Sequence, residues 1–242
     1  MTNRTAETSP LVYARLTGLL LVIVAAISAF SIIYVPSTLI VPGDATATAD
    51  NDRASGGLFH LGIVSDTLIF LTEIVLSVLI YVLLRPVSRT LALVAAFARL
   101  AMGVIMGINL LPYFTAMLLL SGAGYLTVFE PAQSDALVLL FLNAHQDVVY
   151  IWQLFFGFHL AVLGYLIYKS GYFPWILGVL MVIAALGYLT DAYGNILVPN
   201  YDETFGWIVG VGAVIGELPF FLWLLIRGVN VERYNERAQQ PR

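Results

Sequence analysis

The chain contains no cysteine and few charged residues. Its 242 residues include no Cys, and 11% of them are Asp, Glu, Lys or Arg, against about 25% in an average soluble domain. The absence of Cys excludes disulfides, thiolate metal sites, iron–sulfur clusters, thiol nucleophiles and thioether-linked haem. With 60% hydrophobic residues and a mean hydropathy of +0.90, the composition indicates an integral membrane protein.

The sequence also lacks any surplus of basic charge. Its formal net charge is -4 and no basic stripe is present, so nucleic acid is not an expected partner, whereas membrane lipid is. The first apolar run, LTGLLLVIVAAISAFSIIYV, is too long for the core of a signal peptide, which is about 7–15 residues, and it predicts an uncleaved helix.

Six apolar segments are each long enough to cross a hydrocarbon layer of about 30 Å. We predict an all-α membrane protein with six transmembrane helices in one bundle, occupying residues 12–228 between tails at 1–11 and 229–242. The predicted spans are roughly 12–35, 58–84, 90–120, 136–168, 173–194 and 205–227.

Lys and Arg are distributed unevenly between the two sides of these spans. If both termini are cytoplasmic, Arg53 lies outside, Arg99 lies within a span, and the remaining nine of the 11 basic residues lie inside. This asymmetry predicts that both termini are cytoplasmic. The nine are Arg4, Arg15, Arg85, Arg89, Lys169, Arg227, Arg233, Arg237 and Arg242.

Four ionisable residues are predicted at one depth on four different helices: Glu73, Arg99, His159 and Glu217. Each lies ten to twelve residues from the basic residue at the cytoplasmic end of its span, which corresponds to about 15–18 Å along a helix. Ionisable groups inside spans are costly and are functional candidates by default.

The simplest interpretation of this layer is structural. Glu73 and Arg99 face each other across the hairpin formed by the second and third spans and are expected to form an ion pair. His159 and Glu217 would then still need a role. Two carboxylates, a guanidinium and an imidazole together would suit a proton-coupled site, with Asp66 and Asp191 leading to it from outside.

A second polar layer lies nearer the outer face and contains ligand types suited to a divalent metal. His60, His145, Asp66 and Asp147 could hold such an ion, although the sequence has no HExxH or HxxxH motif. His145 and Asp147 are two residues apart, so on a regular helix they point about 160° from each other. A metal-dependent enzyme at this layer is the alternative function.

A haem b site is a further alternative. His145 and His159 have a spacing like that of haem-binding histidines in b-type cytochromes, but two bis-histidine haems need four histidines and the chain has three. We therefore expect no cofactor, with a divalent metal or haem b as the less favoured cases.

Three GxxxG patterns allow close helix contact. In a six-helix chain they more often describe packing inside the bundle than a homo-oligomer interface, and both uses stay open. The pairs are Gly103 with Gly107, Gly206 with Gly210, and Gly212 with Gly216.

Several unusual strings occur in an order that resembles the bacterial membrane-protein family catalogued as domain of unknown function 4386. They are LIVPGDATATADN, LFHLGIVSD, YVLLRPVSRTLALVAAFARL, LLLSGAGYL, FFGFHLAVLGYLIYKSGYFPWILGVL and LGYLTDAYGNILVPNY. The resemblance covers about residues 11 to 201 and implies a multi-span protein of the bacterial cytoplasmic (inner) membrane. It implies no activity.

The function expected from these residues is non-enzymatic. The bundle would bind or pass a proton, an ion or a small molecule at its internal polar site. Protonation of His159 or Glu217 would alter pairing with Arg99 and so change helix packing. No residue is assigned a catalytic role. A sensory or accessory subunit, whose partner supplies the chemistry, is a third reading.

Overall fold

The structure is a computed structural model that describes residues 9–198 and 201–240, and within those ranges it contains helices and turns but no strand. Six helical segments are long and apolar enough to cross a membrane, as predicted, which fits a multi-pass integral membrane protein. They are Pro10–Leu39, Gly56–Leu84, Arg89–Leu120, Pro131–Ser170, Trp175–Leu197 and Glu203–Ile226.

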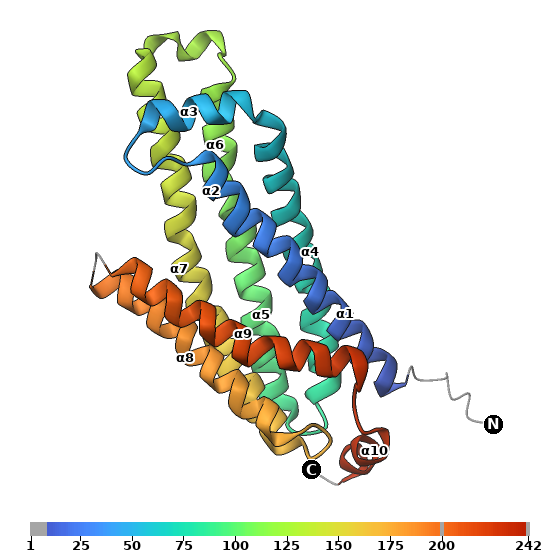
Figure 1. Ribbon diagram of the computed structural model, residues 1–242. Helices are drawn as coiled ribbons and strands as arrows, with labels where there is room; N and C mark the ends of the chain where they lie inside the picture. The colour runs from blue at the N-terminus through green and yellow to red at the C-terminus, as the bar shows by residue number, and fades with distance from the viewer. Residues whose placement is uncertain (1–8, 199–200, 241–242) are drawn as a thin grey trace, which may run out of the picture. The chain divides into compact units, whose positions relative to one another are not determined.

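Figure 1 labels the individual helices. The first span consists of α1 (Pro10–Ser28), a π-helical segment (Ala29–Tyr34) and α2 (Val35–Leu39), and the third consists of α5 (Arg89–Ile108) and α6 (Leu110–Leu120). The other spans are α4 (Gly56–Leu84), α7 (Pro131–Ser170), α8 (Trp175–Leu197) and α9 (Asp202–Ile226). Three short helices lie between or after the spans: α3 (Ala45–Ala54), a 3-10 helix (Gly124–Val128) and α10 (Val231–Gln239).

The helix ends follow local sequence signals. Gly171 has a φ of 74° after α7, the left-handed conformation that glycine adopts most readily at the end of a helix. Pro174 then precedes α8. The Asp44 carboxylate caps α3 by accepting from the Ala47 N–H at 2.9 Å, and Asn230 caps α10 by accepting from the Arg233 N–H at 3.0 Å.

The residues form two compact units, a division that the predicted single bundle does not indicate. Unit 1 comprises residues 1–23, 72–102 and 153–242, and unit 2 comprises residues 24–71 and 103–152. The two units are therefore described separately. Four of the helices, α1, α4, α5 and α7, contribute residues to both units.

Glycines allow close helix contact in unit 1. A Cβ on Gly178 of α8 would lie 2.5 Å from the Gly164 carbonyl oxygen and 2.6 Å from the Tyr168 backbone nitrogen, both on α7. Gly212 and Gly216 of α9 lie against Ala184 of α8. The GxxxG pattern at these two positions therefore describes packing inside the unit.

The other GxxxG pair on α9 has different surroundings. A Cβ on Gly206 or Gly210 would meet no atom within 4 Å, and the same holds for Gly107 on α5. The prediction that these faces could serve a homo-oligomer therefore stays a prediction.

Helix α10 is fixed to the rest of unit 1 by tyrosine side chains. The buried Tyr234 hydroxyl donates to the Val82 carbonyl at 2.9 Å, and the Tyr172 hydroxyl donates to the Leu83 carbonyl at 2.8 Å. The two rings pack edge to face with centroids 5.2 Å apart. Residues 229–242, predicted only as a tail, thus include a packed helix.

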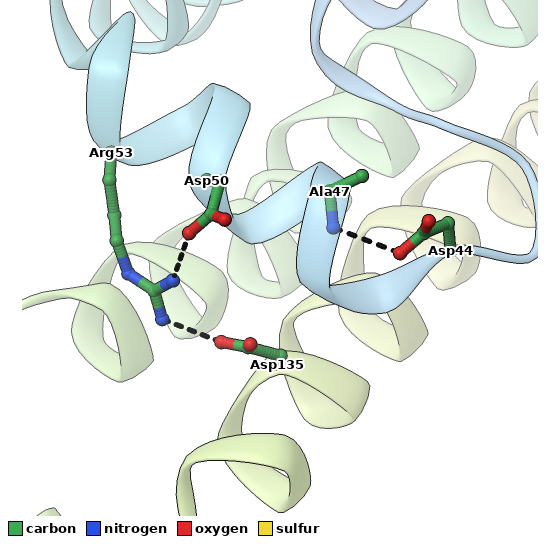
Figure 2. Close-up of polar contacts among 5 residues, drawn as sticks. All are labelled: Asp44, Ala47, Asp50, Arg53 and Asp135. Carbon is green, nitrogen blue, oxygen red and sulfur yellow. Dashed lines mark hydrogen bonds and ion pairs between the residues drawn. The ribbon is translucent and has the colours of Figure 1, made fainter.

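Unit 2 has its own apolar core and an ion pair that joins α3 to α7. Its buried residues include Leu39, Phe59, Tyr113 and Leu142. In Figure 2, Arg53 of α3 reaches two carboxylates, Asp50 on its own helix at 2.9 Å and Asp135 on α7 at 2.5 Å. This contact ties α3, a segment predicted only as an outer loop, to the start of α7.

The close approach of α7 and α8 predicts the effect of a small substitution. Gly178→Ala should lower the free energy of unfolding by about 1–3 kcal/mol, because its methyl group would overlap backbone atoms that cannot move aside easily. Gly210→Ala is the matched control and should be neutral or slightly stabilising, since that position is open. Thermal unfolding of both variants in detergent micelles measures the difference, and equal midpoints would contradict this packing.

Candidate functional site

The predicted ion pair between Glu73 and Arg99 is present and lies inside unit 1. Arg99 Nη2 donates to Glu73 Oε1 at 3.0 Å, and Arg99 Nε lies 2.5 Å from Oε2 of the same carboxylate. Arg99 is 2% exposed and Glu73 is 4% exposed. This two-point contact matches the planar guanidinium to the carboxylate and neutralises both charges inside the protein.

His159 binds to the same arginine. Its Nδ1 lies 2.7 Å from the Ala95 carbonyl oxygen, which can only accept, so Nδ1 carries the proton. Its Nε2 lies 3.2 Å from Arg99 Nη1 and must accept from that N–H group. His159 is therefore a neutral imidazole with both nitrogens engaged, and it fixes the orientation of the guanidinium.

Glu217 makes a different kind of contact. It is 6% exposed, and its Oε1 accepts a hydrogen bond from the Tyr188 hydroxyl at 2.8 Å. The charges of Arg99 and Glu73 both act on this carboxyl, whereas the hydrogen bond that it accepts comes from a neutral hydroxyl group. The four residues predicted at one depth thus divide into an ion pair with a histidine and a carboxyl bonded to a tyrosine.

Phe156 of α7 lies among these groups. Its ring centroid is 5.9 Å from Arg99 Cζ, and the ring packs edge to face on Tyr188 with centroids 4.8 Å apart. It also stacks beside His159 at 6.0 Å. The aromatic face contributes a cation–π contact to the arginine. These contacts link the Arg99 side of the cluster to the Tyr188 side.

Asp191 extends the polar cluster along α8. It is 4% exposed, accepts from Asn195 Nδ2 at 2.9 Å and lies beside the Gln153 side chain of α7. Its charge acts on the Tyr188 hydroxyl one turn earlier on the same helix. Half-buried Asn195, Asp191 and Tyr188 therefore lie along one face of α8, and Tyr188 contacts Glu217.

The outer-layer histidine of α7, His145, lies in unit 2 and is hydrogen-bonded to backbone. Its Nδ1 donates to the Asn109 carbonyl at 2.7 Å, and Asn109 Nδ2 donates to the His145 carbonyl at 2.9 Å. The imidazole stacks on Tyr113 with ring centroids 3.5 Å apart. Its Nε2 is 3.9 Å from Asp66 Oδ2, beyond hydrogen-bonding distance. These contacts describe a helix-to-helix connection.

The other two residues of the predicted outer metal site differ in burial from His145 and Asp66, which are both buried. Asp147 and His60 are exposed, and His60 Nδ1 contacts the Gly56 carbonyl in the preceding turn of its own helix. The opposite burial of His145 and Asp147 agrees with their predicted divergence on α7. Within residues 9–198 and 201–240, no group of three or more His, Asp or Glu is placed to hold a metal ion.

Asp52 of α3 is an unexpected buried acid. It is 2% exposed, and neither of its carboxylate oxygens has a hydrogen-bond partner among the described residues. Burial raises its pKa from 3.8 to about 6, and the neighbouring Arg53 charge only partly offsets that effect.

Sequence reasoning missed Tyr188 and Asp52 as members of polar sites. Tyr188 is three residues before Asp191 on α8, so the two share a helix face, and that spacing could have identified it. No comparable signal marks Asp52, because its burial depends on α3 packing in a segment that reads as a loop.

Comparison with known proteins gives a family but no activity. A family model described as "Domain of unknown function (DUF4386)" matches residues 16–228. This range agrees with the resemblance seen in the sequence and extends it to include Glu217. A protein of Archaeoglobus fulgidus (strain ATCC 49558 / DSM 4304 / JCM 9628 / NBRC 100126 / VC-16), titled "Uncharacterized protein", is 29% identical over 166 residues, covering 69% of this chain and 83% of that protein. No solved structure matches the chain.

The buried ion pair predicts strong coupling between its members. Arg99→Met should lower the free energy of unfolding by about 3–5 kcal/mol, because it leaves the Glu73 carboxylate buried without a cation. Adding Glu73→Gln should recover part of that loss, so the double variant is more stable than the sum of the single effects. Arg53→Met, at a side chain 46% exposed, is the control and should cost at most about 1 kcal/mol. Additive effects of the Arg99 and Glu73 substitutions in denaturant unfolding would contradict the pair.

The raised pKa of Asp52 predicts a pH effect on stability. Between pH values of about 4 and 6 the folded protein holds a proton that the unfolded chain has released, so stability should fall as pH rises through this window. Asp52→Asn should flatten the dependence and raise the unfolding temperature at neutral pH. Asp50→Asn, at an exposed position on the same helix, should leave the slope in place. A slope that survives Asp52→Asn would exclude this origin.

Proposed function

We propose that this chain, which belongs to the DUF4386 family, is a non-enzymatic multi-pass membrane protein that binds and passes a proton at a buried polar cluster. The cluster comprises Glu73, Arg99, His159 and Glu217, with Tyr188 as the hydrogen-bond partner of Glu217. The observation that carries the proposal is the Glu217 carboxyl, which is buried and hydrogen-bonded to a tyrosine.

The charge balance of the cluster supports a proton as the ligand. Glu73 and Arg99 neutralise each other, and His159 is neutral. An ionised Glu217 therefore leaves one uncompensated negative charge in the cluster, and a protonated Glu217 leaves none. Because an unpaired charge inside a membrane protein is costly, one proton is the smallest change that alternates the cluster between two charge states.

The hydrogen bonds favour Glu217 over His159 as the group that takes the proton. A second proton on His159 would have to sit on Nε2, which already accepts an N–H group from Arg99, and it would place two cations side by side. Glu217 can accept a proton without breaking the contacts of Arg99. In this proposal His159 orients Arg99 and does not titrate.

The line of polar groups on α8 supports a route to Glu217. The Tyr188 hydroxyl can both donate and accept a hydrogen bond, so it can relay a proton between Asp191 and Glu217. Asp191 contacts half-buried Asn195 near the end of α8. We assign this end to the outer side, with both termini in the cytoplasm and the protein in the bacterial cytoplasmic membrane. Asp66 belongs to unit 2, and its part in the route stays a prediction.

Substitution of Glu217 tests the proposal directly. In infrared difference spectra between low and high pH, the wild-type protein should show a carboxyl C=O band that disappears in Glu217→Gln. In liposomes with an imposed pH gradient, Glu217→Gln should abolish the proton flux, and Tyr188→Phe should reduce it while leaving the band.

Glu203→Gln is the matched control, because Glu203 lies at the other end of α9 and is exposed. It should change neither the infrared band nor the flux. A band and a flux that are unchanged in Glu217→Gln would refute the proposal. If the band is lost in Glu217→Gln but the wild-type protein shows no proton flux, the proposal of proton binding stands and that of proton passage is refuted.

A further inference from the structure

A cavity in unit 1 lies where several helices end, away from the Glu217 cluster. Its volume is about 890 Å³, and it is lined by residues of α1, the end of α4, the turn that follows, the start of α5 and α10. That turn joins two apolar spans, Gly56–Leu84 and Arg89–Leu120. The cavity is therefore at the end of the apolar segments, the level at which lipid headgroups meet water.

Basic and hydroxyl side chains dominate the polar lining of this cavity. Arg85 lies in the turn and Arg89 is the first residue of α5, and Tyr13, Tyr81 and Asn235 also line the cavity. A second cavity of about 410 Å³ shares Pro86 and Arg89 with the first and adds Arg237 of α10. No Asp or Glu from the described part of the chain lines either cavity.

Two helix starts add to the positive potential. Ser9 and Pro10 at the beginning of α1 line the larger cavity, as does Arg89, the first residue of α5. The N-terminal end of a helix carries a partial positive charge and free backbone N–H groups. These ends supplement the arginines, which supply the full charges.

We propose that this cavity binds an anionic phosphate group. A guanidinium presents two parallel N–H donors that match the oxygen atoms of a phosphate, and two such residues lie within five positions of each other. Tyrosine hydroxyls and the Asn235 amide can donate further hydrogen bonds to phosphate oxygens. The volume is in the range of small-molecule sites and exceeds a bare phosphate severalfold, so it has room for a phosphate ester.

Helix α10 forms one wall of this cavity, so a bound ligand would contact it directly. Val231, Tyr234, Asn235 and Ala238, which line the cavity, lie on one face of α10. Tyr234 is fixed to Val82 by its hydroxyl group, so the wall is preorganised. A phosphate held between Asn235 and the two arginines would join α10 to the turn between α4 and α5. The cavity shares no lining residue with the Glu217 cluster, so ligand binding there is independent of the proposed proton function.

Binding to the full-length protein in a mild detergent tests the site. The probes are phosphatidylglycerol, as a phosphate carried by a lipid, and glycerol 3-phosphate, as its soluble counterpart, and native mass spectrometry measures retention. We expect wild-type protein to retain at least one probe and the Arg85→Gln/Arg89→Gln variant to bind it about tenfold to thirtyfold more weakly. Retention of phosphatidylglycerol alone identifies a lipid headgroup, and retention of both identifies the phosphate ester itself.

Two further variants keep the test decisive. Ala238→Trp adds bulk at an exposed position of α10 and fills the cavity while both arginines remain, so it should weaken binding to a similar extent. Arg227→Gln removes an exposed arginine at the end of α9 that lines neither cavity, and it should bind like the wild type. Retention of neither probe by the wild type, or equal losses in Arg227→Gln and Arg85→Gln/Arg89→Gln, would overturn the proposal.

Discussion

The buried guanidinium of Arg99 constrains the arrangement of the helices in unit 1 more than any other polar group does. A charged Arg99 inside an apolar segment must be paired, and Glu73 on α4 supplies the opposite charge at two points. Nη1 of the same guanidinium contacts Nε2 of His159 on α7, whose other nitrogen is fixed by a carbonyl of α5. Rotation of α4, α5 or α7 about its axis would leave a buried polar group unpaired, so this one residue sets the facing of three helices.

The two units use buried polar groups in different ways. In unit 1 the charged side chains of Glu73 and Arg99 form an ion pair. Glu217 is hydrogen-bonded to a neutral hydroxyl group, and the charges of that pair act on it. In unit 2 His145 and Asn109 each donate a side-chain hydrogen bond to the other's backbone carbonyl, and neither donor group is charged. Exchanges of this kind stabilise helix contacts in membranes by about 0.6–2 kcal/mol. The proposed proton chemistry therefore rests on Glu217 of unit 1, a buried carboxyl that is hydrogen-bonded to Tyr188 and lies beside a charged pair.

Sequence alone was sufficient for features that depend on helical rise and hydropathy. The six spans follow from segment length, and the common depth of Glu73, Arg99 and His159 follows from counting residues along regular helices from the turns. The rotation of each helix was not available from counting, so Tyr188 as the partner of Glu217 and Ala95 as the partner of His159 emerged only from the structure. Helix α3 reads as a polar loop because its stability comes from the Asp44 cap and from Arg53 contacting Asp135, a residue 82 positions away.

Fixing α10 by tyrosine has a consequence for the order in which the protein is assembled during synthesis. The Tyr234 hydroxyl reaches a carbonyl in α4 that is translated 152 residues earlier, and Tyr172 reaches the adjacent carbonyl from a turn translated between them. The Leu83 carbonyl can be satisfied as soon as Tyr172 has been made, but the Val82 carbonyl can be satisfied by its native partner only after α8 and α9 have been synthesised, since α10 follows both. Docking of α10 is therefore a late step in biogenesis, and in a ribosome-bound chain that ends before Tyr234 the Val82 carbonyl still lacks its native partner.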